Sequence, residues 1–250
     1  DALPISLPLN LTFSMEWLGR LYKSIELLDK AIVKCHQCPR LVEWREEVAV
    51  TKRKAYENEK YWGKPVPGFG PSDARIVILG LAPGAHGANR TGRVFTGDSS
   101  GDWLYRALHK AGLAKIPTST SAKDGQELID TRILCAVRCA PPDNKPSTEE
   151  KATCAPFFEN EIELLLPTAK SFLALGSLAW DSIYRTLKDL GCEMPTPKPK
   201  FGHGEKYSFT GPDGEKRKVF GCYHPSQQNT FTGKLTEKML DSVIKSAAKG

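Results

Sequence analysis

The sequence predicts an α/β domain with four parallel strands in one sheet and helices on both faces of that sheet. Short apolar runs such as Arg75-Ile-Val-Ile-Leu79 are continuous, which is typical of strands buried on both sides. Longer segments with helical spacing of apolar residues separate these runs, and strand–helix alternation of this kind favours a parallel sheet. No internal repeat or low-complexity tract interrupts the pattern, so one domain is expected.

The expected elements follow the chain in a regular order. Strands are predicted at 75–79, 133–137, 171–175 and 218–223, and helices at about 102–111, 148–165, 177–190 and 235–249. Ser147 and Glu150 form a capping-box pattern at the start of the second of these helices. Ahead of the first strand, apolar residues recur with helical spacing from 16 to 34, and 40–60 is a strongly charged helix or loop. We therefore expect an N-terminal helical extension.

Composition and charge exclude several classes of protein. The 250 residues are 40% hydrophobic and 26% charged, which is globular and excludes wholesale disorder. No apolar run approaches the roughly 20 residues that span a bilayer, so no membrane partner is expected. The net charge of +6 suggests a polyanionic partner. Residues 1–14 lack the basic start of a signal peptide, and we expect a tag or disordered leader there, a single domain over 15–250 and a cytoplasmic location.

The seven cysteines indicate metal or redox chemistry, because disulfides are rare in a reducing compartment. Cys35-His-Gln-Cys38 places two thiols one turn apart, and Cys139 and Cys154 form a second pair. Four thiolates in two pairs suit either tetrahedral zinc or an iron–sulfur cluster, and their spacing leaves both open. Cys135 is a fifth candidate. The remaining two are expected to be small buried hydrophobes: Cys192 and Cys222.

Two loops are expected to carry the chemistry, because both follow predicted strands at the edge where open α/β sheets bind ligands. The first, Gly80–Gly97, is rich in glycine, which lets backbone approach a ligand closely. It contains neither a Walker A loop nor a dinucleotide-binding fingerprint. Phe95 lies within it and is equally compatible with stacking on a planar ligand and with a core role. The second loop contains His224, which is placed to act as a proton donor or electrophile.

Three motifs in order resemble the uracil-DNA glycosylase superfamily, and specifically its family 5, the broad-specificity branch of bacteria and archaea. They are Gly80-Leu-Ala-Pro-Gly-Ala-His-Gly-Ala-Asn-Arg-Thr-Gly-Arg93, Arg138-Cys-Ala-Pro-Pro142 and His224-Pro-Ser226. Matching stretches run from Cys35 to the last helix. The resemblance implies a three-layer α/β sandwich around a central four-stranded parallel sheet. It also implies a monofunctional enzyme that flips a damaged nucleotide out of DNA and hydrolyses its N-glycosidic bond.

The same resemblance implies roles for individual residues. Cys35, Cys38, Cys139 and Cys154 would ligate a 4Fe–4S cluster, which favours iron–sulfur over zinc. Phe95 would stack on the flipped base, and His224 would hydrogen-bond its carbonyl as the bond breaks. The pocket would be completed by Gly80, Ala82, Gly84 and Ser226, and DNA would be contacted by Arg90, Arg93, Gln227 and Asn229. The stretch 227–232 is the expected wedge into the minor groove.

One departure from related branches concerns the attacking water. Many of those branches carry an aspartate or asparagine at this position. This chain has Ala82 there, and in this it resembles other family 5 sequences. Asn89 and then Asn144 are the candidates to hold the water, and Asn144 is also a candidate to contact the base. Cys135 stands where a related branch has its base-reading asparagine, which predicts looser discrimination between bases.

The expected partner is DNA that contains uracil or hypoxanthine, with the protein acting as a monomer. Two alternatives remain open. The chain could be a non-catalytic damage-binding protein with the same pocket, because Ala82 removes one expected catalytic group. It could also be a zinc-stabilised hydrolase or nucleotide-binding enzyme whose glycine-rich loop cradles phosphate.

Overall fold

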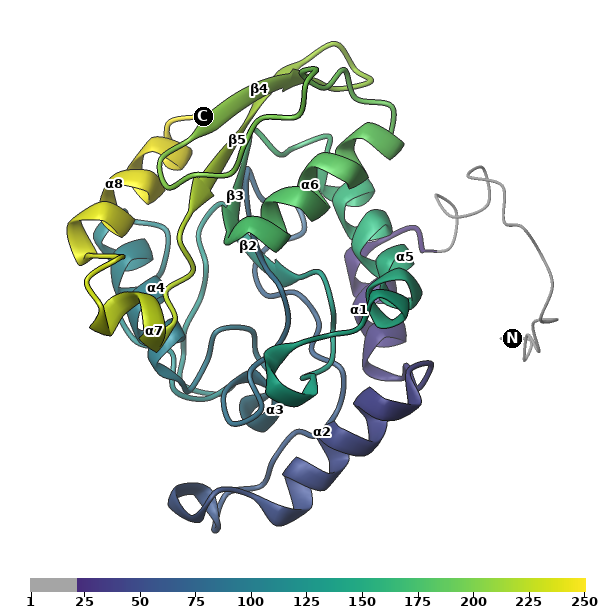
Figure 1. The fold of residues 1–250 in the computed structure, drawn as a ribbon, viewed down its shortest axis with the longest axis vertical. Coiled ribbons are helices and arrows are strands. Elements are labelled where there is room, and N and C mark those ends of the chain that lie inside the picture. The colour runs from purple at the N-terminus through teal and green to yellow at the C-terminus, as the bar shows by residue number, and fades with distance from the viewer. Residues whose placement is uncertain (1–21) are drawn as a thin grey trace, which may run out of the picture.

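The computed structural model describes residues 22–250 (Figure 1). Its strands are β1 (Ile76–Gly80), β2 (Thr131–Cys135), β3 (Ser171–Leu175), β4 (Lys206–Thr210) and β5 (Lys216–Cys222). Its α-helices are α1 (Ile25–Val33), α2 (Pro39–Thr51), α3 (Ala88–Thr91), α4 (Ser99–Lys110), α5 (Thr148–Leu165), α6 (Ser177–Asp189), α7 (Gln227–Phe231) and α8 (Glu237–Ala248). Two short 3₁₀ turns are η2 (Lys54–Tyr56) and η3 (Pro142–Asn144).

The sheet has five strands in the order β2-β1-β3-β5-β4. Four of them are parallel, as predicted, and β4 pairs antiparallel with β5 at the edge. The prediction of four strands is therefore one short. β4 was not predicted because it contains no continuous apolar run. Its residues alternate between exposed and buried, which is the pattern of a strand with one face in water. The bounds of β3 and α5 match the predicted bounds.

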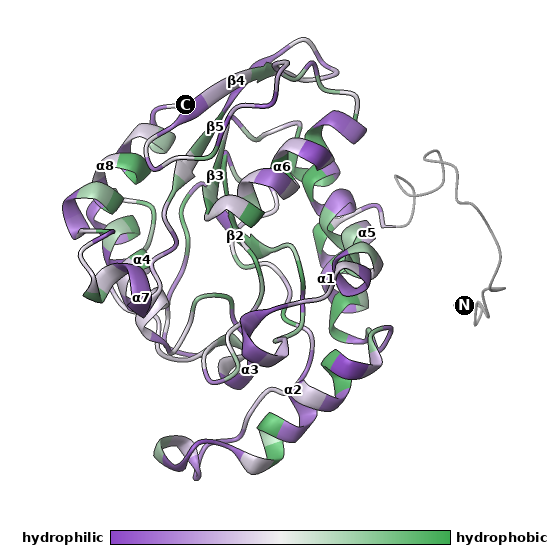
Figure 2. Ribbon diagram, viewed as in Figure 1, coloured by the Kyte–Doolittle hydropathy of each residue, from purple (hydrophilic) through white to green (hydrophobic). Residues whose placement is uncertain are grey.

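Helices cover both faces of the sheet and complete three layers (Figure 1). Helices α4 and α8 pack together on one face, where Ile76 and Ile78 enter an apolar core. Helices α5 and α6 cover the other face, where Val77 and Leu79 enter a second core. Successive strand residues point to opposite faces, so these apolar runs supply both cores. Figure 2 shows the strands mostly hydrophobic and the helices mixed, with hydrophilic residues on their outer surfaces.

The N-terminal extension is helical. Ser24 caps α1, and α1 packs against α5. The helix predicted over 16–34 is described only from residue 22, and the leader expected at 1–14 lies outside the described residues. The charged stretch 40–60 contains α2 and η2. No helix within residues 22–250 is long and apolar enough to cross a membrane.

A buried ion network ties the extension to the sheet. Glu161 on α5 is fully buried and accepts hydrogen bonds from Arg132 Nε (2.6 Å) and from Arg138. Arg132 on β2 also pairs with Asp29 on α1 at 2.9 Å. Burial alone would raise the pKa of Glu161, but Arg138 and Arg132 hold that pKa below its usual range. The ionised carboxylate thus joins α1, β2 and α5.

Glu161→Gln should destabilise the protein strongly, because it leaves two buried guanidinium groups without their shared anion. Breaking a buried ion pair in this way costs about 3–5 kcal/mol. The urea midpoint of unfolding measures the loss. Glu237→Gln is the matched control, because Glu237 pairs with Arg106 and Lys110 on the surface, where ion pairs contribute little. Equal midpoints for the two variants would contradict the assigned role of Glu161.

Candidate active site

The four parallel strands end at one edge of the sheet. The connection after β1 leads to β2 on one side, whereas β3 is followed by the strands on the other side. The chain therefore diverges between β1 and β3, and open α/β sheets bind ligands at such a switch point. Both loops expected to carry chemistry leave from this edge, one after Gly80 and the other after Cys222.

Phe95 lies directly over the end of β1. A Cβ atom on Gly80 would stand 2.9 Å from ring atoms of Phe95, so only glycine leaves room for the ring. Phe95 has a φ of +50°, a left-handed conformation that is costly for a bulky residue and is found mainly where function demands it. Its ring centroid is 5.7 Å from that of His224, with 34° between the ring planes. The structure thus brings these two predicted site residues together.

His224 lies beside the turn after β3, accepts a hydrogen bond from α7 and is neutral. Gly176 lies at the turn between β3 and α6. A Cβ atom placed on Gly176 would stand 3.8 Å from the Cβ of His224. Asn229 on α7 donates from Nδ2 to the His224 carbonyl oxygen at 2.8 Å. Asn229, expected at the DNA, therefore positions the histidine loop. Burial lowers the pKa of His224 to about 4, so the imidazole at neutral pH offers one N–H donor without carrying a charge.

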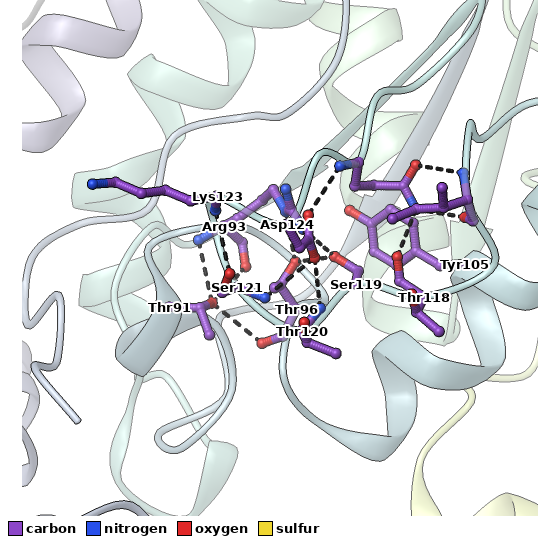
Figure 3. Close-up of polar contacts among 12 residues, drawn as sticks. Thr91, Arg93, Thr96, Tyr105, Thr118, Ser119, Thr120, Ser121, Lys123 and Asp124 are labelled. Carbon is purple, nitrogen blue, oxygen red and sulfur yellow. Dashed lines mark hydrogen bonds and ion pairs between the residues drawn. The ribbon is translucent and has the colours of Figure 1, made fainter. Parts of the chain in front are cut away.

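The glycine-rich loop is anchored by a buried arginine (Figure 3). Arg93 donates to both carboxylate oxygens of Asp124 at 2.7 and 2.8 Å and to Ser119 Oγ at 2.7 Å. Its Nε donates to Thr96 Oγ1 at 3.0 Å. Partial burial would raise the pKa of Asp124, but hydrogen bonds from Arg93 and from backbone amides lower it to about 2. Arg93 therefore clamps the segment that carries Phe95 to the loop before β2.

Arg90 acts in the same way within the loop. Its Nε donates to the carbonyl oxygen of His86 and its Nη2 to that of Gly97, both at 2.7 Å, and its Nη1 pairs with Glu59. Arg90 and Arg93 were expected to contact DNA. In the structure both guanidinium groups are buried and bind partners inside the protein, and the expected contact with DNA stays a prediction.

Asn89 and Ala82 also face inward. Asn89 is fully buried, and its Nδ2 donates to the carbonyl oxygen of Arg45 on α2 at 3.1 Å. Its Nδ2 is thus engaged by α2, whereas its Oδ1 is buried without a hydrogen-bond partner among the described residues, and its expected role at the attacking water stays a prediction. Ala82 packs against the apolar cluster around Cys139 and Cys154. A carboxylate at this position would be placed against apolar surface, which gives a physical reason for the alanine.

The other predicted residues lie at the rim. Asn144 is exposed, has a left-handed φ of +57° and follows β2 on η3. Its side chain makes no hydrogen bond to any residue in the described range 22–250 and is open to a ligand or water. Ser226 precedes α7, and Gln227 on the first turn of that helix is exposed.

The residue that sequence reasoning missed is Asp98. Its Oδ1 accepts from the backbone amide of Gly101 at 2.9 Å and caps α4. Its Oδ2 occupies the space that side chains at Gly87 and Gly84 would need. A Cβ atom at these two positions would stand 2.0 and 3.2 Å from Oδ2. Burial raises the pKa of Asp98. The signal was present in the sequence, because Asp98 is the only acidic residue between Gly80 and Gly101.

The four predicted cysteine ligands line a single cavity beside the loop. Cys35 and Cys38 come from the turn between α1 and α2, Cys139 follows β2, and Cys154 is on α5. Two N–H groups point at their sulfurs: Arg45 Nη1 lies 3.0 Å from Cys139 Sγ, and the backbone N of Arg138 lies 3.3 Å from Cys154 Sγ. Cys135, the fifth candidate, is buried at the end of β2 and does not line this cavity.

The donor set fits an iron–sulfur cluster. Among residues 22–250 no group of three or more His, Cys, Asp or Glu side chains is arranged to hold one metal ion. A cluster carries its own iron and sulfide between the ligands, so its four cysteines need not surround a single ion. N–H groups directed at the ligand sulfurs suit such a site, because hydrogen bonds to sulfur are among the features that tune clusters. Burial raises the pKa of Cys139 to about 11 and of Cys154 to about 12, so a bound metal would have to displace their protons.

Fold and site together define an α/β protein with an aromatic ring and an imidazole side by side at its strand ends. A family model described as the uracil DNA glycosylase superfamily matches residues 67–248. The type-5 uracil-DNA glycosylase of Mycobacterium tuberculosis is 51% identical over 226 residues, 90% of this chain and 81% of that protein. That of Thermus thermophilus is 45% identical over 224 residues, 90% of this chain and 97% of that protein. A type-4 uracil-DNA glycosylase of Pyrobaculum aerophilum is 28% identical over 156 residues, 62% of each chain.

The chain therefore belongs to the uracil-DNA glycosylase superfamily. Its similarity is greater to these type-5 proteins than to the type-4 protein, which confirms the resemblance found in the motifs.

His224 should remain neutral well below the range where a free imidazole titrates. In the unfolded chain it takes up a proton below about pH 6.5, but in the folded protein only near pH 4. This side chain therefore weakens folding progressively as the pH falls from the first value toward the second. Imidazole chemical shifts measured by NMR as the pH falls from 8 should show His224 still neutral through pH 6.5, with its midpoint near pH 4. A midpoint near 6.5 would contradict the buried, neutral assignment.

Proposed function

We propose that this protein excises uracil, and also hypoxanthine, from DNA by hydrolysing the N-glycosidic bond and leaving an abasic site. The observation that carries the proposal is the pairing of Phe95 with a neutral His224 at the strand ends, in a chain of this superfamily. An aromatic ring offers a stacking surface for a planar base. The imidazole N–H offers a hydrogen bond to a base carbonyl.

The chemistry follows from where charge develops. As the bond breaks, negative charge accumulates on the departing base and positive charge on the sugar. A neutral N–H donor aimed at the base carbonyl is more valuable there than in the ground state, and burial strengthens its effect. His224 is proposed to provide this donor without transferring a full proton, since burial keeps the imidazole neutral.

Two groups are proposed to hold the attacking water. Asn144 is exposed at the rim with a free side chain, and Asp98 directs Oδ2 at the Gly84–Gly87 part of the loop. With Ala82 packed against the cysteine-lined cavity, these residues take the place of a polar group after β1.

The proposal that the protein accepts more than one base rests on Cys135, which borders the end of β1. A Cβ on Gly80 would stand 3.5 Å from Cys135 Sγ, so a thiol and not an amide borders the end of β1. A site rejects wrong ligands sharply when its buried hydrogen-bonding groups would be left unpaired. A thiol is a weak donor and acceptor, so hypoxanthine should be accepted along with uracil.

The cysteine-lined cavity is proposed to hold a 4Fe–4S cluster on Cys35, Cys38, Cys139 and Cys154. When bound, such a cluster would cross-link the N-terminal extension to α5 and to the segment after β2. We propose a structural role for it. The monomeric state remains a prediction.

Single-turnover cleavage of matched duplexes with uracil, hypoxanthine or no lesion tests the function. The parent protein should leave abasic sites at both lesions and none in undamaged DNA. His224→Ala should slow excision by about 10²–10³-fold, the usual loss for one donor to a developing anion. His109→Ala is the control, because His109 is exposed near the end of α4 and its ring hydrogen-bonds the Ala114 carbonyl oxygen. Tight binding of lesions without any abasic product would instead indicate a damage-binding protein.

Helix α7 supplies the proposed wedge. Phe231 is 80% exposed at the end of this helix, a few residues after His224, and apolar side chains of this kind enter base stacks in proteins that open DNA. Phe231→Ala should slow uracil excision from duplex DNA and spare excision from single strands, which need no opening. Val50→Ala is the control, since Val50 is equally exposed but lies on α2. Equal losses on duplex and single-stranded substrates would contradict a wedge.

A further inference from the structure

Arg45 on α2 is buried in an unusual way. Its side chain is 0% exposed, yet it has no hydrogen-bonded carboxylate partner. Its Nη1 lies 3.0 Å from Cys139 Sγ, and both Nη atoms donate to the carbonyl oxygen of Cys35 at 3.2 Å. Its Nε has no hydrogen-bond partner among the residues that the structure describes. The nearest carboxylate oxygen is that of Glu46 at 3.6 Å, on a side chain that is 54% exposed.

The other fully buried arginines have acidic partners. Arg138 pairs with Glu161, and Arg217 pairs with Asp213 at 2.6 Å. An isolated buried cation is costly, so buried charges are normally paired or bound to an ion of opposite sign. We therefore expect a negatively charged group on the side to which the Arg45 guanidinium points. That direction is the cysteine-lined cavity.

Arg45 also contacts the glycine-rich loop through its backbone. Its carbonyl oxygen accepts from Asn89 Nδ2 at 3.1 Å, and within residues 22–250 the Oδ1 of that buried asparagine has no hydrogen-bond partner. The backbone amide of Asn89 donates to the Gly84 carbonyl at 3.0 Å, and its carbonyl oxygen accepts from the Gly63 amide. One residue thus links a cysteine sulfur on one side with the loop that carries Phe95 on the other.

We propose that Arg45 is the counter-cation of the cysteine-bound cluster and a positioning residue that makes the order of the glycine-rich loop depend on cluster occupancy. The inference rests on the cluster placed in this cavity under the proposed function. A cluster with four thiolate ligands carries net negative charge, which compensates the guanidinium. Without the cluster, Arg45 loses this negative charge, and the contact between α2 and Asn89 weakens.

The test compares Arg45→Gln, Arg45→Lys and the control Arg53→Gln, which removes an exposed arginine beyond the end of α2. Iron release to a chelator should be about 10–100-fold faster in Arg45→Gln, the usual loss when a partner of a metal ligand is removed. The cluster midpoint potential should become more negative, because a nearby positive charge that favours the reduced cluster is gone. Arg45→Lys keeps the charge, and it should restore the potential more fully than the rate of iron release.

Hydrogen exchange measures the coupling to the loop. Amides of α3 and of residues 84–87 should exchange faster in Arg45→Gln than in Arg53→Gln, and equally fast in parent protein stripped of iron. If Arg45→Gln does not fold, the comparison of iron-loaded and stripped parent protein still decides the coupling. Iron release, potential and exchange all unchanged in Arg45→Gln would overturn the proposal. So would a parent protein that excises uracil but contains no iron. A parent that holds iron yet excises no uracil would refute the proposed function alone.

Discussion

The glycine-rich loop packs only a few side chains of its own into the core, Ala88, Val94 and Phe95 among them, and the rest of the site depends on how this loop is held in place. Glycines let the loop turn closely over the strand ends, but they supply no apolar surface. Buried polar groups replace that surface: Arg90 and Arg93 bind loop carbonyls and Asp124, and Asn89 binds α2. These contacts keep Phe95 in a left-handed conformation over Gly80.

A loop held by internal charges leaves the surroundings of Phe95 at the end of β1 poor in charge. Phe95, Gly80 and Cys135 are apolar or nearly so, and His224 is neutral because burial disfavours the imidazolium. Such a site suits a reaction in which charge appears only as a bond breaks, since a preorganised donor in a dry environment acts most strongly on that charge. The same polar framework extends through Asn89 and Arg45 to the cysteines, so the pocket and the proposed cluster share one support.

Much of the fold was predictable because short stretches of sequence show which residues are buried. The continuous apolar runs at Ile76–Gly80 and Ser171–Leu175 and the capping box at Ser147 identified strands and a helix. The edge strand β4 was missed because alternation over five residues is a weak signal. In the site, His224 and Phe95 were found by their position after strands. The internal contacts of Arg90 and Arg93 were not predicted. The sequence around an arginine in a basic chain does not show whether its guanidinium binds a phosphate or a carboxylate such as Asp124.

The sequence by itself therefore determined the class of fold, the edge of the sheet at which the site lies and the family, because each depends on patterns within short segments. The tertiary structure alone decided which polar residues face inward. Arg93 meets a carboxylate 31 residues away, and Arg45 meets a sulfur 94 residues away. Such pairings are set by chain packing, and no local pattern records them. The tertiary structure also revealed Asp98 beneath Gly84 and Gly87, where two absent side chains make room for one carboxylate.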